Sequence, residues 1–333
     1  MGGDQKSNYY NELYARSIAA GGVAVTFLGL LFVFLALKRD FSTAISTWTI
    51  LGIFFGTNLF HYATKEMGGV HVYSFCLFAA LFYYFPIYLK KPGLQQSLIL
   101  GAILGWLFLI RPTNGIVFLW LLGYQVYTWE ELKARFRFFL KHYLSCLGII
   151  AAALIMLFPQ LLYWKEMTGH WIYYSYSDEG FIHWKNPKIA AVLFDVQNGL
   201  FLYSPLALLM MAGIFLGILR KRFSGPVLLI IFALATYAFA SWWAWWFGGA
   251  FGHRCYVEYY ALLALPLAGV YQWVVERTSP GVKYGFILLT IVLMIYSVRL
   301  SFLYTSIGGP WDGEAWRWNW EKYAWVMSHF FKT

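Results

Sequence analysis

The feature that most constrains this chain is its series of long, uncharged apolar runs separated by short charged connections. Of the 333 residues, 60% are hydrophobic and 12% are charged, against about 45–50% and about 25% in an ordinary soluble domain. Lipid offers backbone amides no water, so such a run must cross a bilayer as a helix or as part of a closed barrel. These runs are continuous rather than alternating, which favours helices. The sequence therefore predicts an all-α, polytopic membrane helix bundle.

About 20 apolar residues are needed to cross the roughly 30 Å hydrocarbon layer of a bilayer. By this standard we expect about ten transmembrane helices. The predicted spans cover residues 17–37, 43–62, 69–89, 94–110, 115–129, 143–163, 204–219, 225–246, 257–275 and 284–304. The fourth and fifth spans are short and separated only by residues 111–114, so a hairpin that does not fully span is an alternative for this pair.

The basic residues are distributed unevenly among the connections. Thirteen of the 25 Lys and Arg residues lie in five connections, at 38–39, 90–91, 133–141, 220–222 and 277–283. The short connections between them carry one each: Lys65, Arg111 and Arg254. Lys and Arg concentrate in cytoplasmic loops, so these five are predicted to be cytoplasmic and both termini to lie outside.

An outward N-terminus without a signal peptide favours a chain that lacks an upstream helix. The alternative is a short protein whose first helix inserts with its N-terminus outward.

The predicted transmembrane domain covers residues 1–304, and a tryptophan-rich outer tail covers 305–333. Within the domain, 164–203 is expected to form a long outer loop. Residues 130–142 mix phenylalanine with four cations, which is typical of an amphipathic helix on the cytoplasmic membrane surface. The net charge of +10 would favour nucleic acid in a soluble protein. Here the cations cluster between apolar runs, so the predicted partner is the lipid bilayer and not nucleic acid.

Glu66 lies in a short outer connection, with His61 and His71 five residues away on either side. A carboxylate beside imidazoles can bind a divalent cation such as Zn²⁺ or Mn²⁺, and it can also take a proton from a hydroxyl as a general base. Glu66 is therefore the candidate catalytic base, and Glu66 with His71 is a candidate metal pair. The alternative is a solvated Lys65–Glu66 pair in a loop whose histidines cap helix ends.

Two arginines at the predicted outer edge are candidate phosphate ligands, because a guanidinium presents a fixed fork of donors. Arg111 precedes Asn114, which can cap the next helix and leave its N-terminal amides to favour an anion. The alternative for Arg111 is a side chain that snorkels to the interface. Arg254 follows the Gly248-Gly249 pair, whose freedom to adopt positive φ suits an anion-receiving turn.

Two further pairs are candidate substrate contacts. Tyr203 and Ser204 precede a proline, a pattern that a helix start explains by itself, although both side chains could face a head-group pocket. Asp178 and Glu179 lie among aromatic residues in the outer loop. Carboxylates accept hydroxyl bonds and rings stack on sugars, so this pair could receive an acceptor, with a solvated turn as the alternative.

In their order along the chain, four of these stretches resemble the bacterial GT-C glycosyltransferases, which are related to protein mannosyltransferases and lipid A aminoarabinose transferases. The matching residues are Gly56 to Tyr62 with Glu66 and His71, Gly105 with Arg111 to Asn114, Gly199 to Pro205, and Trp242 to Arg254. Together they extend over most of residues 17–275.

The resemblance implies a GT-C-like bundle in the bacterial inner membrane. Such enzymes pass a sugar from a polyprenyl-phosphate donor to a glycan, lipid or protein acceptor at the outer face, with inversion at the anomeric centre. A carboxylate deprotonates the acceptor hydroxyl, cationic groups stabilise the departing phosphate, and in several members a divalent cation takes part. In this family the principal catalytic aspartate lies in the first outer loop. Residues 1–10 resemble only the end of that loop, so this chain is expected to be partial.

Two other classes of function stay open. A transporter or flippase often carries charged sites near the bilayer midplane in two related halves, whereas the predicted helix centres here hold almost no charge. A non-catalytic membrane scaffold would account for the missing aspartate loop.

Overall fold

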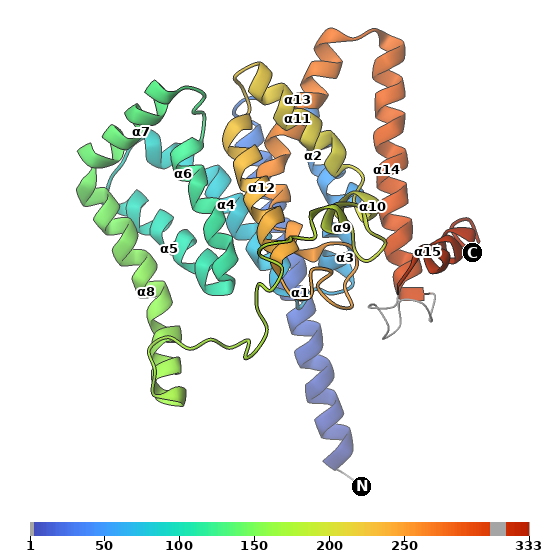
Figure 1. Ribbon diagram of the computed structural model, residues 1–333, viewed down its shortest axis with the longest axis horizontal. Helices are drawn as coiled ribbons and strands as arrows, with labels where there is room; N and C mark the ends of the chain where they lie inside the picture. Colours follow the sequence, from blue (N-terminus) through green and yellow to red (C-terminus); the bar gives the residue numbers. More distant parts are fainter. Residues whose placement is uncertain (1–2, 307–317, 333) are drawn as a thin grey trace.

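The computed structural model describes residues 3–306 and 318–332. Within this part the chain forms helices, turns and irregular segments, without a β-strand. The all-α prediction is therefore confirmed, and Figure 1 shows the helices gathered into a bundle. Residues 307–317 of the predicted tail, with Trp311 and Trp316, lie outside the described residues.

The helices follow the apolar runs along the chain. They are α1 (Gly3–Leu37), α2 (Thr43–Gly56), α3 (Leu59–Thr64), α4 (Val70–Lys90), α5 (Leu94–Ile110), α6 (Leu119–Gly123), α7 (Trp129–Lys141), α8 (Tyr143–Thr168), α9 (Ile189–Phe194), α10 (Leu200–Tyr203), α11 (Ala207–Leu219), α12 (Gly225–Ser241), α13 (Tyr260–Arg277), α14 (Pro280–Ser306) and α15 (Trp320–Ser328). Two short 3-10 segments are η1 (Pro112–Phe118) and η2 (Arg254–Tyr256). The amphipathic helix expected at 130–142 corresponds to α7, which begins with a capping box at Thr128 and Glu131.

Four helices of the described chain are long and apolar enough to cross a membrane. They are Asn11–Leu37 of α1, Val70–Lys90, Tyr143–Thr168 and Pro280–Thr305 of α14. Five other apolar helical segments have only 10–17 residues, fewer than the roughly 20 that a perpendicular crossing needs. A membrane protein is thus supported, whereas the expected count of about ten full spans is not confirmed.

The predicted span 43–62 is divided into α2 and α3 by a long-range hydrogen bond. The backbone amide of Asn58 donates to the Ser204 hydroxyl over 2.9 Å, so it does not continue the helical ladder of α2. A backbone amide buried in a bundle must find a partner, and here the partner comes from a distant part of the chain.

The predicted span 115–129 is also broken. It forms η1 and the five-residue α6, which ends at Gly123. Carbonyl groups at the end of α6 accept hydrogen bonds from the guanidinium of Arg135, at 3.0 Å for Leu121 and 2.9 Å for Tyr124. These bonds satisfy groups that a continuing helix would otherwise use. The α5–η1–α6 segment therefore resembles the short hairpin considered for residues 94–129.

The connections rich in basic residues gather at one end of the bundle. In Figure 1, α7, the α11–α12 turn and the α13–α14 turn lie toward the top. The segment after α8, α3 and the connection between α12 and α13 lie toward the opposite end. This arrangement follows from helices that alternate in direction, and it separates the basic turns from the candidate site. Which end faces the cytoplasm stays a prediction.

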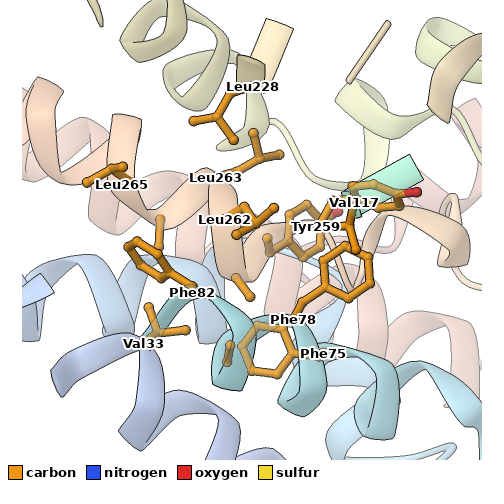
Figure 2. Close-up of a cluster of buried hydrophobic side chains, with 14 of the residues drawn as sticks. Val33, Phe75, Phe78, Phe82, Val117, Leu228, Tyr259, Leu262, Leu263 and Leu265 are labelled. Carbon is orange, nitrogen blue, oxygen red and sulfur yellow. The ribbon is translucent and has the colours of Figure 1, made fainter. Parts of the chain in front are cut away.

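Helices α4 and α13 occupy the centre of the bundle, and their facing side chains form its apolar core. Figure 2 shows this packing, to which α1, η1 and α12 also contribute. Its labelled members are Val33, Phe75, Phe78, Phe82, Val117, Leu228, Tyr259, Leu262, Leu263 and Leu265. The centre of the bundle is therefore filled mainly by apolar and aromatic side chains.

The described end of the predicted tail packs against the bundle. Trp318 and Val326 are buried in a second cluster that includes Leu300 of α14. The Trp318 indole donates to the hydroxyl of Tyr203 over 3.2 Å. This part of the tail is therefore a structural element of the site end.

Helix α8 lies at the side of the bundle and packs closely on α5 through two glycines. A Cβ placed on Gly101 would lie 2.3 Å from the carbonyl oxygen of Ile149, and one on Gly105 would lie 2.8 Å from that of Ala153. Small residues four apart allow two membrane helices to approach at backbone distance. The pair therefore determines how closely α8 can join the bundle.

We expect Gly101→Val to lower the free energy of unfolding by about 1–3 kcal/mol, because the added side chain must separate α5 from α8. The measurement is the thermal unfolding midpoint of the purified protein in detergent. Gly281→Val is the matched control, because no atom lies within 4 Å of a Cβ at this position. Equal midpoints for the two variants would show that the close approach of α5 and α8 does not stabilise the protein.

Candidate functional site

A buried group of charged side chains lies at the end of the bundle opposite the basic turns. Glu258, which precedes α13, is 1% exposed. One carboxylate oxygen accepts from Arg111 Nη1 over 3.1 Å, and the other lies 3.1 Å from His71 Nδ1. Arg111 Nη2 also lies 3.1 Å from Cys255 Sγ. A buried carboxylate needs such partners because removal from water strongly disfavours its charge.

Local structure brings these three side chains together. Arg111 is the residue at which α5 ends, in extended backbone conformation before Pro112, as expected for a residue that precedes proline. His71 lies in the first turn of α4. Three separate helix ends therefore meet at Glu258.

The sequence analysis did not select Glu258 as a site residue. A detectable signal was present, because Glu258 lies inside the predicted span 257–275. An ionisable group within a membrane run is a functional candidate by default, and it needs a partner. Arg111 at the same predicted edge was the natural choice for that partner.

Glu66 and His71, the candidate metal pair, have different partners. Glu66 Oε1 lies 3.2 Å from Nε2 of His61, and His61 Nδ1 lies 2.9 Å from the hydroxyl of Ser301. His71 instead contacts Glu258. Among the described residues, there is no group of three or more His, Cys, Asp and Glu side chains that could hold a metal ion. Glu66 has 39% of its side chain exposed, so a reactant could reach its carboxylate.

Asn58 connects four segments at the centre of this end. Its backbone amide donates to the hydroxyl of Ser204, and its side-chain nitrogen donates to the carbonyl of Phe251 over 3.1 Å. The hydroxyl of Tyr260 donates to the Asn58 side-chain oxygen over 2.9 Å. Ser204 is therefore buried and engaged with protein groups, as is Tyr203, whose hydroxyl donates to the carbonyl of Val196.

The sequence analysis suggested that Asn114 caps the following helix, but in the structure it does not. It lies within η1 and is buried. Its side-chain nitrogen donates to the hydroxyl of Ser74 over 3.2 Å and to the carbonyl of Leu107 over 3.1 Å. Asn114 thus ties η1 to α4 and α5, close to the partly buried Arg111.

The glycine-rich connection before η2 has positive φ at Gly248 but not at Gly249, the other member of the pair singled out from the sequence. Gly248 and Gly252 have φ values of +71° and +64°. The side-chain nitrogen of Asn198 donates to the carbonyl groups of Trp246 and Gly248, over 2.8 and 3.2 Å. Gly249 is exposed at the surface of this connection. The turn is therefore held in place from α9–α10, and it leads directly to Arg254.

Arg254 is partly buried, and within residues 3–306 and 318–332 its guanidinium has no hydrogen-bond or ion-pair partner. Both Arg254 and Glu66 lie near enough to the phenol of Tyr62 for their charges to act on it. Burial lowers the pKa of the neighbouring His253 to about 3, which keeps this imidazole neutral at physiological pH. Arg254 is therefore a cation of the site end that has no partner in the described part of the chain.

Asp178 and Glu179 lie in the exposed segment between α8 and α9, where they line an open depression with Tyr176 and Trp243. The backbone amide of Trp243 donates to the carbonyl of Gly180 over 2.9 Å. This bond holds the segment against the end of α12, and the two carboxylates stay accessible to solvent.

Comparisons with protein-family models, with curated proteins and with solved structures find no match for this chain. Function is therefore inferred from the residues of the site.

Proposed function

We propose that this protein is a GT-C-like glycosyltransferase of the membrane, which moves a sugar from a polyprenyl-phosphate donor to a glycan, lipid or protein acceptor at the outer face. The observation that carries the proposal is the partly buried Arg254, which has no counter-ion in the described chain. Charged groups at the edge of a membrane bundle are costly and usually serve a ligand. A guanidinium without a carboxylate partner suits the phosphate of a lipid donor.

The two arginines have different roles in this proposal. Arg254 is free to bind the donor phosphate. Arg111 is already paired with Glu258, so its role is structural: it supports the position of η2 through Cys255. The glycine connection before η2 allows the donor to approach the backbone.

Glu66 is the proposed base. Its carboxylate is accessible and is oriented by His61, whose other nitrogen is held by Ser301. A base and a departing phosphate act on opposite faces of a sugar in an inverting displacement. Glu66 and Arg254 both act on the phenol of Tyr62, and the proposal places the sugar between them.

We expect Arg254→Ala to weaken binding of a polyprenyl phosphate by about 10- to 100-fold, since a hydrogen bond to a charged group contributes about 1.5–3 kcal/mol. Binding is measured on purified protein in detergent, and sugar transfer is measured from a radiolabelled polyprenyl-phosphate sugar. Arg277→Ala is the control, because Arg277 is exposed in the last turn of α13 at the opposite end.

Unchanged binding and transfer in Arg254→Ala would rule out the assigned role of Arg254. Movement of the labelled lipid across vesicles without any glycosyl product would instead favour a transporter or flippase.

A further inference from the structure

A second polar cavity lies at the basic end of the bundle, far along the helices from the candidate glycosyl-transfer site. It has a volume of about 490 Å³ and is formed where three turns meet: α1–α2, α6–α7 and α11–α12. Its polar wall is made of Arg39, Asp40, Tyr124, Gln125, Tyr127, Glu131, Lys221, Arg222 and Ser224, and its apolar wall of Ala36, Phe82, Pro86, Phe223 and Leu265. We call it the basic-end cavity.

The three cations of the basic-end cavity are Arg39, Lys221 and Arg222, and none of them forms a close ion pair with a described carboxylate. Arg39 lies 4.5 Å from the ring centroid of Tyr83, and Arg222 lies 5.1 Å from that of Phe223. Ring contacts orient a guanidinium but leave its charge uncompensated. The cations are therefore available to an anion from solution or from the membrane.

Two carboxylates, Asp40 and Glu131, also line the basic-end cavity, and Glu131 is hydrogen-bonded to backbone amides. Glu131 accepts hydrogen bonds from the backbone amides of Tyr127, over 2.6 Å, and Thr128, over 3.0 Å. These bonds lower the pKa of Glu131, and its charge also compensates the N-terminal end of α7. With Asp40, the cavity has two carboxylates against three cations. The cavity therefore keeps a positive balance.

The wall of the basic-end cavity is preorganised. Four of its residues have positive φ, namely Gln125, Lys221, Phe223 and Ser224, with values of 51–57°. Such conformations cost about 1–3 kcal/mol each and persist only when neighbouring groups hold them. Here the buried Ser224 joins two turns: its hydroxyl accepts from the amide of Gln125 over 3.0 Å, and its amide donates to the hydroxyl of Tyr127 over 3.1 Å.

We propose that the basic-end cavity binds one phosphate-bearing molecule, with Arg39, Lys221 and Arg222 around the phosphate. The cavity lies where α1 and α4, both long enough to span a membrane, come to their ends. Its apolar wall beside a cationic rim suits the head group of an anionic lipid. A soluble phosphate ester offers the same anionic group. The basic-end cavity is independent of the proposed glycosyl transfer, because neither Arg254 nor Glu66 lines it.

The test uses the full chain, purified in detergent, with phosphatidylglycerol as the lipid probe and inorganic pyrophosphate as the soluble probe. Native mass spectrometry measures bound lipid, and titration calorimetry measures affinity. We compare Lys221→Gln/Arg222→Gln with Lys90→Gln/Lys91→Gln. The second pair removes the same charge from exposed residues at the same end that do not line the cavity. Matching unfolding midpoints establish that both variants are folded.

We expect one tightly bound phosphatidylglycerol per chain, and about 30-fold weaker binding in Lys221→Gln/Arg222→Gln, since each cation near anionic lipid contributes roughly fivefold. Lys90→Gln/Lys91→Gln should change binding by less than about fivefold. Pyrophosphate that binds with the same dependence on the variants would also support the site and identify a soluble ligand. Equal weakening by both pairs would show only diffuse surface attraction and would overturn the proposal, as would failure of the unmodified protein to bind either probe.

Discussion

Replacement of Glu258 by glutamine is expected to destabilise the folded protein by about 3–5 kcal/mol, the loss typical when one partner of a buried ion pair is removed. Glutamine has nearly the same volume, so the change removes charge and leaves the packing in place. Arg111 would then hold a largely buried guanidinium, 17% exposed, without its carboxylate. The His71 side chain would also lose its anionic partner. The measurement is the unfolding midpoint in detergent.

Glu276→Gln is the matched control, because Glu276 is exposed and bonds only to Gln272 within the described chain. It should shift the midpoint little. An equally small shift in Glu258→Gln would contradict the importance of the buried pair.

A double-mutant cycle with Arg111→Met tests the same pair directly. Removing both charges leaves neither one uncompensated, so the double variant should be more stable than the sum of the single losses predicts. We expect a coupling energy of about 1–3 kcal/mol between the two positions. Additive losses would show that Arg111 and Glu258 stabilise the fold independently.

Gly252→Ala is expected to lower the free energy of unfolding by about 2–5 kcal/mol. The residue has φ of +64°, and its added Cβ would lie 2.8 Å from the Cβ of Tyr203 and 3.3 Å from the side-chain nitrogen of Asn58. Left-handed backbone costs a residue with a Cβ about 1–2 kcal/mol, and the forced shift of neighbours adds about 1–3 kcal/mol. Because Gly252 precedes Arg254 by two residues, binding of polyprenyl phosphate should weaken as well.

Gly248→Ala separates the two contributions to this effect. Gly248 has φ of +71°, yet no atom lies within 4 Å of a Cβ at that position. This variant should therefore show only the backbone cost of about 1–2 kcal/mol. If Gly252→Ala is no more destabilising than Gly248→Ala in the same unfolding measurement, contact with Tyr203 and Asn58 does not explain the need for glycine.

Positions of the helices could be predicted well wherever an apolar run decides its own structure. The run 94–110 coincides with α5, and 69–89 differs from α4 by one residue at each end. In such runs the lack of water leaves the backbone no better partner than its own helix. The runs 43–62 and 115–129 were predicted less well. Their ends are decided by Ser204 and Arg135, side chains that are distant along the chain or belong to another helix.

The polar residues of the site end could also be selected from the sequence, because charges are rare in this chain and their place at the ends of runs is visible. The hydrogen-bond and ion-pair partners of these residues could not be predicted from the sequence. Spacing suggested Glu66 with His71, five residues apart, whereas His71 contacts Glu258, which is 187 residues away, and Arg111 contacts it across 147 residues.

The sequence by itself thus determined that the chain is a bundle of apolar helices with its basic turns and its candidate site at alternate connections. Only the tertiary structure decided which acid compensates which cation, that Arg254 has no partner in the described chain, and that three basic turns enclose a cavity. The physical reason is that the two kinds of interaction act over different separations along the chain. Helix formation in an apolar run depends on neighbours within a few residues, whereas a buried charge is compensated by whichever opposite charge the packing of distant helices brings within about 3–4 Å.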